Sequence, residues 1–111
     1  MPYDFGDVVL ARFPFTSQTT SKLRPAVVIS NRAYNSARLD VVIMAITSQF
    51  RQQAGLGEVW IGDWQAANLL KPSVIKPVFA TLEQTLILKR LGALKPADNM
   101  ALRRAIASVL G

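Results

Sequence analysis

The sequence contains neither cysteine nor histidine. The lack of cysteine excludes disulfide bonds, thiolate nucleophiles and cysteine-ligated zinc. The lack of histidine removes the side chain that normally titrates near neutral pH, and with it imidazole acid/base catalysis and histidine-ligated metals. Any catalysis by this chain must therefore rest on arginine, lysine, hydroxyl or carboxylate groups.

Acidic residues are few and scattered. The chain has only Asp4, Asp7, Asp40, Glu58, Asp63, Glu83 and Asp98. None of these forms the close pair that a two-metal or paired-carboxylate site requires, so we expect no metal ion and no cofactor. The 13 Lys and Arg residues give a net charge of +6. This excess favours a polyanionic or strongly acidic partner through long-range attraction.

Long apolar runs are also missing. The longest, residues 41–46, is far shorter than the roughly 18 residues that indicate a membrane-spanning helix. The N-terminal segment carries Asp4 and Asp7 and has no apolar core segment, so it does not resemble a signal peptide. We therefore expect a cytoplasmic protein without a membrane segment. A chain of 111 residues that is 50% hydrophobic predicts a single domain, residues 1–111, with one modest core.

Runs rich in β-branched residues predict most of the secondary structure. Strands are expected at residues 7–13, 25–30, 40–46 and 58–61. The third run is nearly continuous in apolar residues, which favours a strand buried on both faces. Residues 63–70 predict a short helix, because Asp63 is a favourable N-cap and Pro72 follows.

The rest of the chain predicts short strands and a terminal helix. Residues 73–94 mix β-branched residues with Pro77, which we expect at a strand start or edge. Pro96 suits a first helical position, and Asp98 suits the positive end of a helix dipole. One apolar face of this helix is formed by Leu102, Ile106, Val109 and Leu110. The pattern predicts a mainly β protein with short helices, folded as a small, partly closed antiparallel barrel.

Three blocks of the sequence stand at the ends of predicted strands. They are Gly6-Asp7-Val8-Val9, Lys22-Leu23-Arg24-Pro25-Ala26-Val27-Val28-Ile29 and Ile46-Thr47-Ser48-Gln49. In order and spacing they resemble the signature blocks of the MazF/PemK toxins. The match continues through Leu70-Lys71-Pro72-Ser73-Val74-Ile75, Thr81-Leu82-Glu83 and the terminal helix, so that it spans nearly the whole chain.

The resemblance implies an SH3-like small barrel with a C-terminal helix. It further implies a homodimeric, metal-independent endoribonuclease that cleaves single-stranded RNA and is neutralised by a cognate acidic antitoxin. The catalytic residues of the family fall on Arg24 and Thr47. Without the family, Arg24 is better explained as a surface charge at a loop end, and Thr47 as an ordinary strand-end threonine; the resemblance reverses both interpretations.

The chemistry of RNA cleavage suits such a chain. RNA supplies its own nucleophile, the 2′-hydroxyl, so the protein must mainly align it and stabilise the crowded phosphorane. The planar guanidinium of Arg24 matches two phosphate oxygens, which a lysine cannot reproduce. Thr47 is expected to orient the phosphate or Arg24. The general base stays unassigned, because a guanidinium remains protonated near pH 7.

Further candidates for RNA binding are Lys22, Ser48, Gln49, Phe15, Thr16 and Phe50. Lys22 would follow the RNA backbone, whereas Ser48 and Gln49 would contact bases or phosphate. Phe15 and Phe50 are candidate stacking platforms for unpaired bases. Thr16 opens a polar loop that adjoins Arg24 and would fold over a bound strand.

One segment departs from the family pattern. Many members carry an acidic residue and a glutamine before the T-[I/L]-[D/E] segment, where this chain has Lys76-Pro77-Val78-Phe79-Ala80. The preferred cleavage sequence therefore cannot be transferred from relatives. Two other functions fit a fold of this kind: a non-enzymatic CcdB-like toxin that acts on DNA gyrase, and an SH3-like binding module. Arg24 beside Pro25 and the block at residues 47–49 argue against the first.

Overall fold

A computed structural model describes residues 2–13 and 22–111. The elements are β1 (Asp7–Phe13), β2 (Lys22–Val28), α1 (Arg32–Ala37), β3 (Asp40–Thr47), β4 (Val59–Trp60), β5 (Val74–Glu83), the 3-10 turn η1 (Gln84–Leu86), β6 (Ile87–Ala93) and α2 (Pro96–Leu110). The strands form one antiparallel sheet in the order β4-β5-β3-β2-β1-β6.

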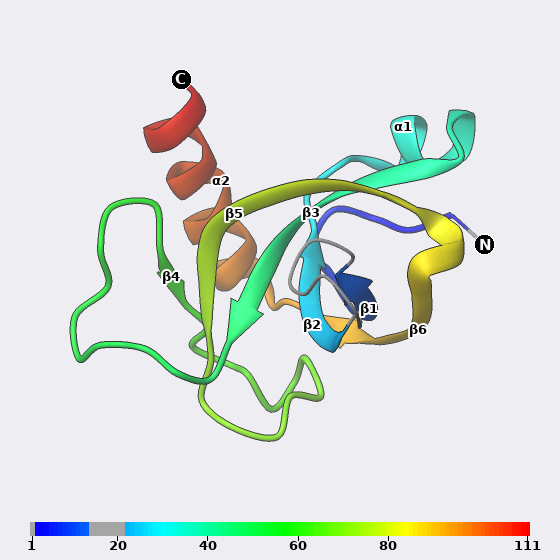
Figure 1. Ribbon diagram of the computed structural model, residues 1–111. Helices are drawn as coiled ribbons and strands as arrows, with labels where there is room; N and C mark the ends of the chain where they lie inside the picture. Colours follow the sequence, from blue (N-terminus) through cyan, green and yellow to red (C-terminus); the bar gives the residue numbers. More distant parts are fainter. Residues whose placement is uncertain (1, 14–21) are drawn as a thin grey trace.

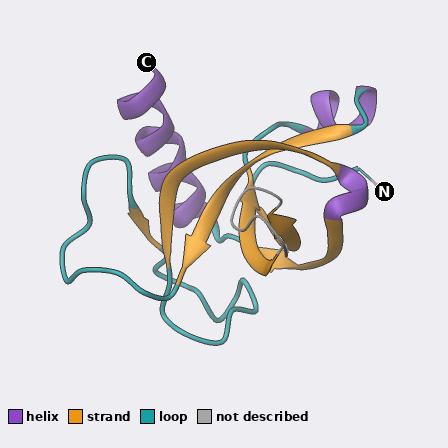
Figure 2. Cartoon of the chain, in the orientation of Figure 1, coloured by secondary structure: helices purple, strands orange, loops and turns teal. Residues whose placement is uncertain are grey.

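The sheet curls into an open barrel (Figure 1). Its end strands, β4 and β6, are not neighbours in the described part of the chain, so the barrel does not close. Figure 2 shows long loops before and after the short β4, and α2 beside that end of the sheet. The prediction of a mainly β, partly closed antiparallel barrel with a C-terminal helix is confirmed. No helix in the described ranges is long and apolar enough to cross a membrane.

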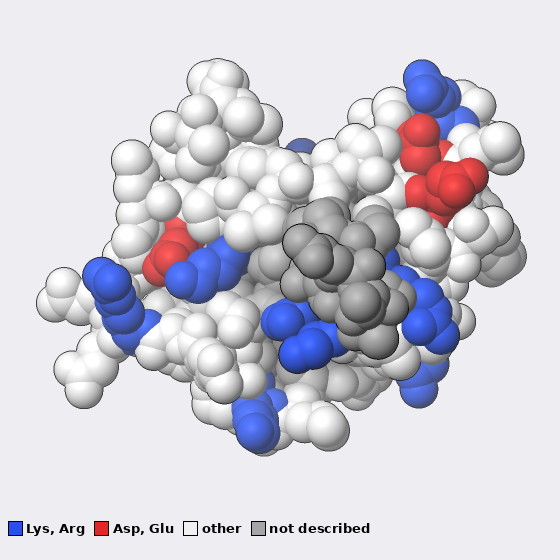
Figure 3. Space-filling view, in the orientation of Figure 1, with Lys and Arg blue, Asp and Glu red and all other residues white. Residues whose placement is uncertain are grey.

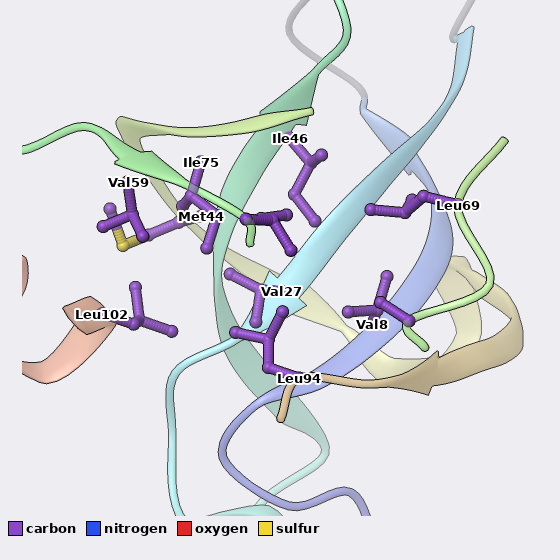
Figure 4. Close-up of a cluster of buried hydrophobic side chains, with 11 residues drawn as sticks. Val8, Val27, Met44, Ile46, Val59, Leu69, Ile75, Leu94 and Leu102 are labelled. Atoms are coloured by element: carbon purple, nitrogen blue, oxygen red, sulfur yellow. The ribbon is translucent and has the colours of Figure 1, made fainter. Parts of the chain in front are cut away.

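The central strands bury side chains on both faces of the sheet. Neighbouring residues of a strand point to opposite faces, and the consecutive Ile43 and Met44 of β3 are both fully buried, in different apolar clusters. Figure 4 shows the first cluster, in which Met44 lies among side chains of β1, β2 and β5 with Leu102 of α2 beside them. Burying each such side chain fully contributes about 1.5–3 kcal/mol to the free energy of folding. The prediction that the third strand is buried on both faces is confirmed.

The helix predicted at residues 63–70 is wrong, because these residues form successive turns. Asp63 does cap one turn, since its Oδ1 accepts a hydrogen bond from the Ala66 N–H at 3.1 Å. Asn68, however, has φ of 59°, in the left-handed region that ends a helix and that asparagine tolerates. Its Nδ2 donates to the Leu91 carbonyl of β6 at 2.6 Å. A tertiary hydrogen bond therefore takes the place of a second helical turn.

The sequence patterns do not predict the helix α1. The Asn31 side chain caps it by accepting the Tyr34 N–H at 2.9 Å. Asn35 is buried, and its Nδ2 donates to the Tyr3 carbonyl at 2.7 Å. Ser30, predicted at the end of a strand, donates from its hydroxyl to the Asn35 side chain instead. The helix is therefore held by buried polar contacts, for which apolar periodicity gives no signal.

Residues 74–83 form one strand of ten residues, where short strands are expected from the sequence. Pro77 lies inside β5, beyond the two residues that pair with β4, so that among the described strands β5 has only β3 as a neighbour there, as expected for a proline at an edge. The β3–β5 register shifts here, so that residues 76–78 lie opposite the single residue Ala45. Such an irregularity accommodates a proline, which has no N–H to donate to the ladder. Strand β2 also begins earlier than expected, at Lys22.

The terminal helix is confirmed, with Pro96 in its first turn. Its predicted apolar face is only partly buried. Leu102 is fully buried and Ile106 packs against the core, whereas Val109 and Leu110 are 42% and 65% exposed. The core therefore uses the first half of this face, because the sheet does not extend along the whole helix.

Candidate functional site

A groove of about 1040 Å³ crosses the ends of β2 and β3 and continues to β6. Its apolar lining includes Leu10, Ile46, Leu69 and Leu91. Its basic lining consists of Lys22, Arg24, Lys71, Lys89 and Arg90, and none of the described lining residues is acidic. The groove therefore suits an anion that also carries apolar surface.

The register of the sheet brings Arg24 and Thr47 together at the groove. Ala26 of β2 lies opposite Ala45 of β3. Two residues further along each strand, the same register puts Arg24 opposite Thr47, with both side chains on one face. Arg24 is exposed and forms no ion pair with any residue that the structure describes. Its guanidinium is therefore available to a ligand.

The Thr47 hydroxyl closes a tight turn at the end of β3. It accepts a hydrogen bond from the Gln49 N–H at 3.1 Å and donates to the Gln49 carbonyl at 3.3 Å. This turn leaves Ser48 and Gln49 exposed at the groove. A phosphate oxygen could replace the longer of these bonds while the shorter one still holds the turn.

The structure brings most of the predicted site residues together. Lys22, which begins β2 opposite Phe13, also lines the groove. Phe50 does not: its ring packs against Trp60, with centroids 5.7 Å apart and planes tilted by 54°. Phe15 and Thr16 lie outside the described residues.

Sequence reasoning missed the far wall of the groove. Asn68 and Lys71 come from the turns before β5, and Lys89 and Arg90 come from β6. The adjacent basic pair at positions 89 and 90 was the only signal in the sequence, and the pairing of β6 with β1 is what brings it to the groove. Arg90 also pairs with Asp7 through Nε and Oδ1 at 3.2 Å.

Figure 3 shows several basic side chains and no acidic side chain over the lower central part of one face. Two described acids outside the groove are neutralised by ion pairs. The pKa of Glu58 lies below its ordinary value because its carboxylate accepts the Gly55 N–H and pairs with Lys76. The pKa of Asp4 is likewise lowered by its hydrogen bonds from Arg32. Both acids are therefore charged near neutral pH, and each has a basic partner of its own.

The described residues contain no group of three or more acidic side chains that could hold a metal ion. Hydrogen-bond donors and positive charge are what the groove offers a ligand. This combination binds a phosphate ester and stabilises negative charge that develops on it.

A family model described as "PemK-like, MazF-like toxin of type II toxin-antitoxin system" matches residues 4–110. No curated protein sequence matches the chain. An endoribonuclease solved with its cognate antitoxin, from a mycobacterial species, has a TM-score of 0.81 and 24% identity, over 98% of this chain and 95% of that one. MazF from Deinococcus radiodurans has a TM-score of 0.77 and 24% identity, over 100% and 98%. The Mycobacterium tuberculosis toxin MazF-mt6 has a TM-score of 0.74 and 20% identity, over 91% and 92%. At these identities the likeness establishes the fold.

Proposed function

The chain belongs to the PemK-like, MazF-like toxin family of type II toxin-antitoxin systems, and from this premise we propose that it is a sequence-selective endoribonuclease that cleaves single-stranded RNA without a metal ion. One observation carries the proposal. Arg24, near the start of β2, and Thr47, at the end of β3, both line a groove that has basic residues and, in its described part, no acid.

In the proposed reaction the RNA 2′-hydroxyl attacks the adjacent phosphorus, and the bond from phosphorus to the 5′ oxygen breaks. The products are a 2′,3′-cyclic phosphate and a 5′-hydroxyl. The hydroxyl loses one proton and the leaving oxygen gains one. The chain has no histidine to carry these protons, so the acceleration rests mainly on stabilising the charge of the phosphorane.

Arg24 is the residue suited to that task. Its guanidinium can present two N–H groups to two phosphate oxygens in a fixed plane. Thr47 lies opposite and holds the turn at residues 47–49, so we assign it to the orientation of the scissile phosphate. The exposed Ser48 and Gln49 are suited to contacts with neighbouring bases, which would make cleavage depend on sequence.

We further propose that a cognate antitoxin neutralises the enzyme by placing an acidic segment in the same groove. A disordered acidic segment can fold on binding and exclude RNA by charge and by volume. One similar solved structure is an endoribonuclease in complex with its cognate antitoxin, which supports this assignment. We also propose that the protein acts as a homodimer, as the family resemblance implies.

The decisive test is turnover of RNA by substoichiometric protein in EDTA. A long single-stranded RNA should be cut many times per protein molecule at a small set of sequences, leaving 5′-hydroxyl ends. A single 2′-deoxynucleotide on the 5′ side of one such cut should protect that bond and no other.

Three other outcomes would contradict the proposed function or its mechanism. Binding without turnover would favour a non-enzymatic toxin or a binding module. Activity that is lost in EDTA and restored by one divalent ion would refute the metal-free reaction. Efficient cutting of the deoxy-substituted bond would show that the 2′-hydroxyl is not the nucleophile.

A further inference from the structure

A second group of basic side chains lines the groove on the β6 side, away from Arg24. It consists of Lys71, Lys89 and Arg90. We propose that this group, centred on Lys89, binds a second phosphate of the RNA, distinct from the phosphate that is cleaved. The inference rests on the proposed RNA cleavage and adds a second point at which the protein holds the RNA strand.

The sheet register sets the distance between the two phosphate positions. Leu10 of β1 lies opposite Pro25 of β2 on one side and opposite Lys89 of β6 on the other. The three residues therefore share one face of the sheet, and the backbones of Pro25 and Lys89 are two strand spacings apart, about 10 Å. Arg24 precedes Pro25, and neighbouring residues of a strand point to opposite faces, so the side chains of Arg24 and Lys89 leave the sheet from different faces and suit different phosphates of one RNA strand.

The second group is held in place before any ligand binds. Asp7 pairs with Arg90 at 3.2 Å, and the Asp7 side chain is only 8% exposed. Its other oxygen accepts the Asp4 N–H at 2.9 Å. The buried carboxylate therefore directs the Arg90 side chain, which loses less conformational freedom when it meets a phosphate.

Lys71 belongs to the turns before β5, and contacts hold these turns against β6, the strand that carries Lys89. The Ser73 hydroxyl donates to the Lys71 carbonyl at 2.9 Å, and Asn68 is bonded to Leu91 of β6. Gly92 allows the close approach, since a Cβ there would lie 2.8 Å from the Ala67 carbonyl oxygen. These contacts hold the turns before β5 against β6 and keep Lys71 on the same wall as Lys89.

Lys89 itself is exposed and has no ion-pair partner among residues 2–13 and 22–111. Its charge is therefore fully available to a ligand. A phosphate held there lies away from the reacting atoms. Its binding should strengthen the substrate complex and the transition state equally, and so change the affinity for RNA much more than the rate of the chemical step.

The test measures the salt dependence of binding with an RNA oligonucleotide that contains one cleavage sequence and a 2′-deoxynucleotide that prevents the cut. For a single strand, the slope of log affinity against log salt becomes shallower by about 0.7 for each phosphate that the protein no longer neutralises. We expect Lys89→Gln to reduce the slope by about that amount and to weaken binding at low salt. The matched control is Arg104→Gln on α2, which removes an exposed charge outside the groove and should leave the slope unchanged.

Neutral methylphosphonates, introduced one at a time, locate the phosphate. With the unaltered protein one position other than the cleaved phosphate should weaken binding when neutralised. With Lys89→Gln the same substitution should have a clearly smaller effect, because the largest contribution to holding that phosphate has been removed. Arg90→Lys keeps a positive charge that can pair with Asp7. In this variant, neutralising the same phosphate should weaken binding somewhat less than in the unaltered protein, which gives a second measurement without loss of the ion pair.

The outcomes separate the two proposals. If the unaltered protein cleaves RNA but Lys89→Gln keeps its salt slope and its sensitivity at every phosphate, the second phosphate position is refuted and the proposed function stands. If Lys89→Gln weakens only the binding of an acidic peptide, the group serves a protein partner and the inference is wrong. If the unaltered protein neither binds nor cleaves RNA, both proposals fail.

Discussion

In the proposed reaction Arg24 has a different task from the other basic residues of the groove. Lys22, Lys71 and Lys89 can each attract a phosphate as point charges. Stabilising a phosphorane instead requires donors in a fixed geometry around two oxygens whose charge increases during the reaction. Arg24 pairs with Ala11 of β1 and is kept extended by the following Pro25, so backbone pairing defines its position near the start of β2.

We predict that Arg24→Lys lowers the single-turnover cleavage rate by about 10²–10³, the usual cost of removing one transition-state interaction. RNA affinity should change much less, because it is spread over several basic groups. Quenched-flow cleavage gives the rate, and fluorescence anisotropy with the 2′-deoxy substrate gives the affinity. Arg12→Lys is the matched control, since Arg12 is an exposed arginine of β1 outside the groove lining. Near-normal cleavage by Arg24→Lys would show that the assigned mechanism is wrong, although the fold is right.

At the scale of elements, the loop after β4 depends on the start of α2. Asp98 is buried, and its two carboxylate oxygens accept the N–H groups of Gly62 and Asp63 at 2.9 and 3.0 Å. From the sequence, Asp98 is recognisable only as favourable for the helix dipole. The structure shows that it also begins the turns at residues 62–68, which lead to the groove.

We predict that Asp98→Ala lowers the free energy of unfolding by about 2–4 kcal/mol, because two charge-assisted hydrogen bonds are removed and two part-buried N–H groups are left without a partner. Urea denaturation followed by tryptophan fluorescence would measure it. Asp63→Ala is the control from the same loop, where one exposed hydrogen bond to Ala66 is removed, and it should cost about 0.5–1.5 kcal/mol. Equal changes in the two variants would contradict the anchoring role of Asp98.

The contrast between local patterns and contacts of distant segments explains how much of the structure the sequence could predict. Runs rich in β-branched and apolar residues predicted β1 and β3, and Pro96 with Asp98 predicted the start of α2, because these patterns record local preferences. The blocks around Arg24 and Thr47 predicted five residues that do meet in the groove: Lys22, Arg24, Thr47, Ser48 and Gln49. The far wall could not be predicted, because the Asn68 bond to Leu91 and the register of Lys89 join segments that are distant in sequence.

Phe50 shows a contact that the sequence could not predict, and its proposed role as a stacking platform stays a prediction. An aromatic residue near a candidate site suggests a stacking platform, yet the place of Phe50 in the structure is set by another aromatic side chain, Trp60. Pairing of this kind contributes about 0.5–1.5 kcal/mol beyond area burial, and single-sequence patterns do not show which aromatic residues will meet.

At the scale of the whole molecule, α2 exposes apolar side chains outside the basic groove. The basic groove lies at the ends of β2 and β3, whereas α2 carries exposed apolar side chains. Met100 and Leu110 are 56% and 65% exposed. At 100° per residue they lie about 80° apart around the helix axis, so one partner surface can cover both. The apolar residues of β3 are largely buried within the chain and leave little surface for a second copy.

We predict that a second copy of the chain covers this side of α2, so that sedimentation velocity at micromolar concentration gives the mass of a dimer. Burying Met100 and Leu110 would remove two large apolar side chains per protomer from water, each worth about 1.5–3 kcal/mol when fully buried. Leu110→Glu should therefore shift the equilibrium towards monomer. Leu39→Glu is the control, because Leu39 is 85% exposed but lies between α1 and β3, far from α2 in Figure 1. A monomeric unaltered protein, or equal dissociation by both variants, would contradict a dimer that is built on α2.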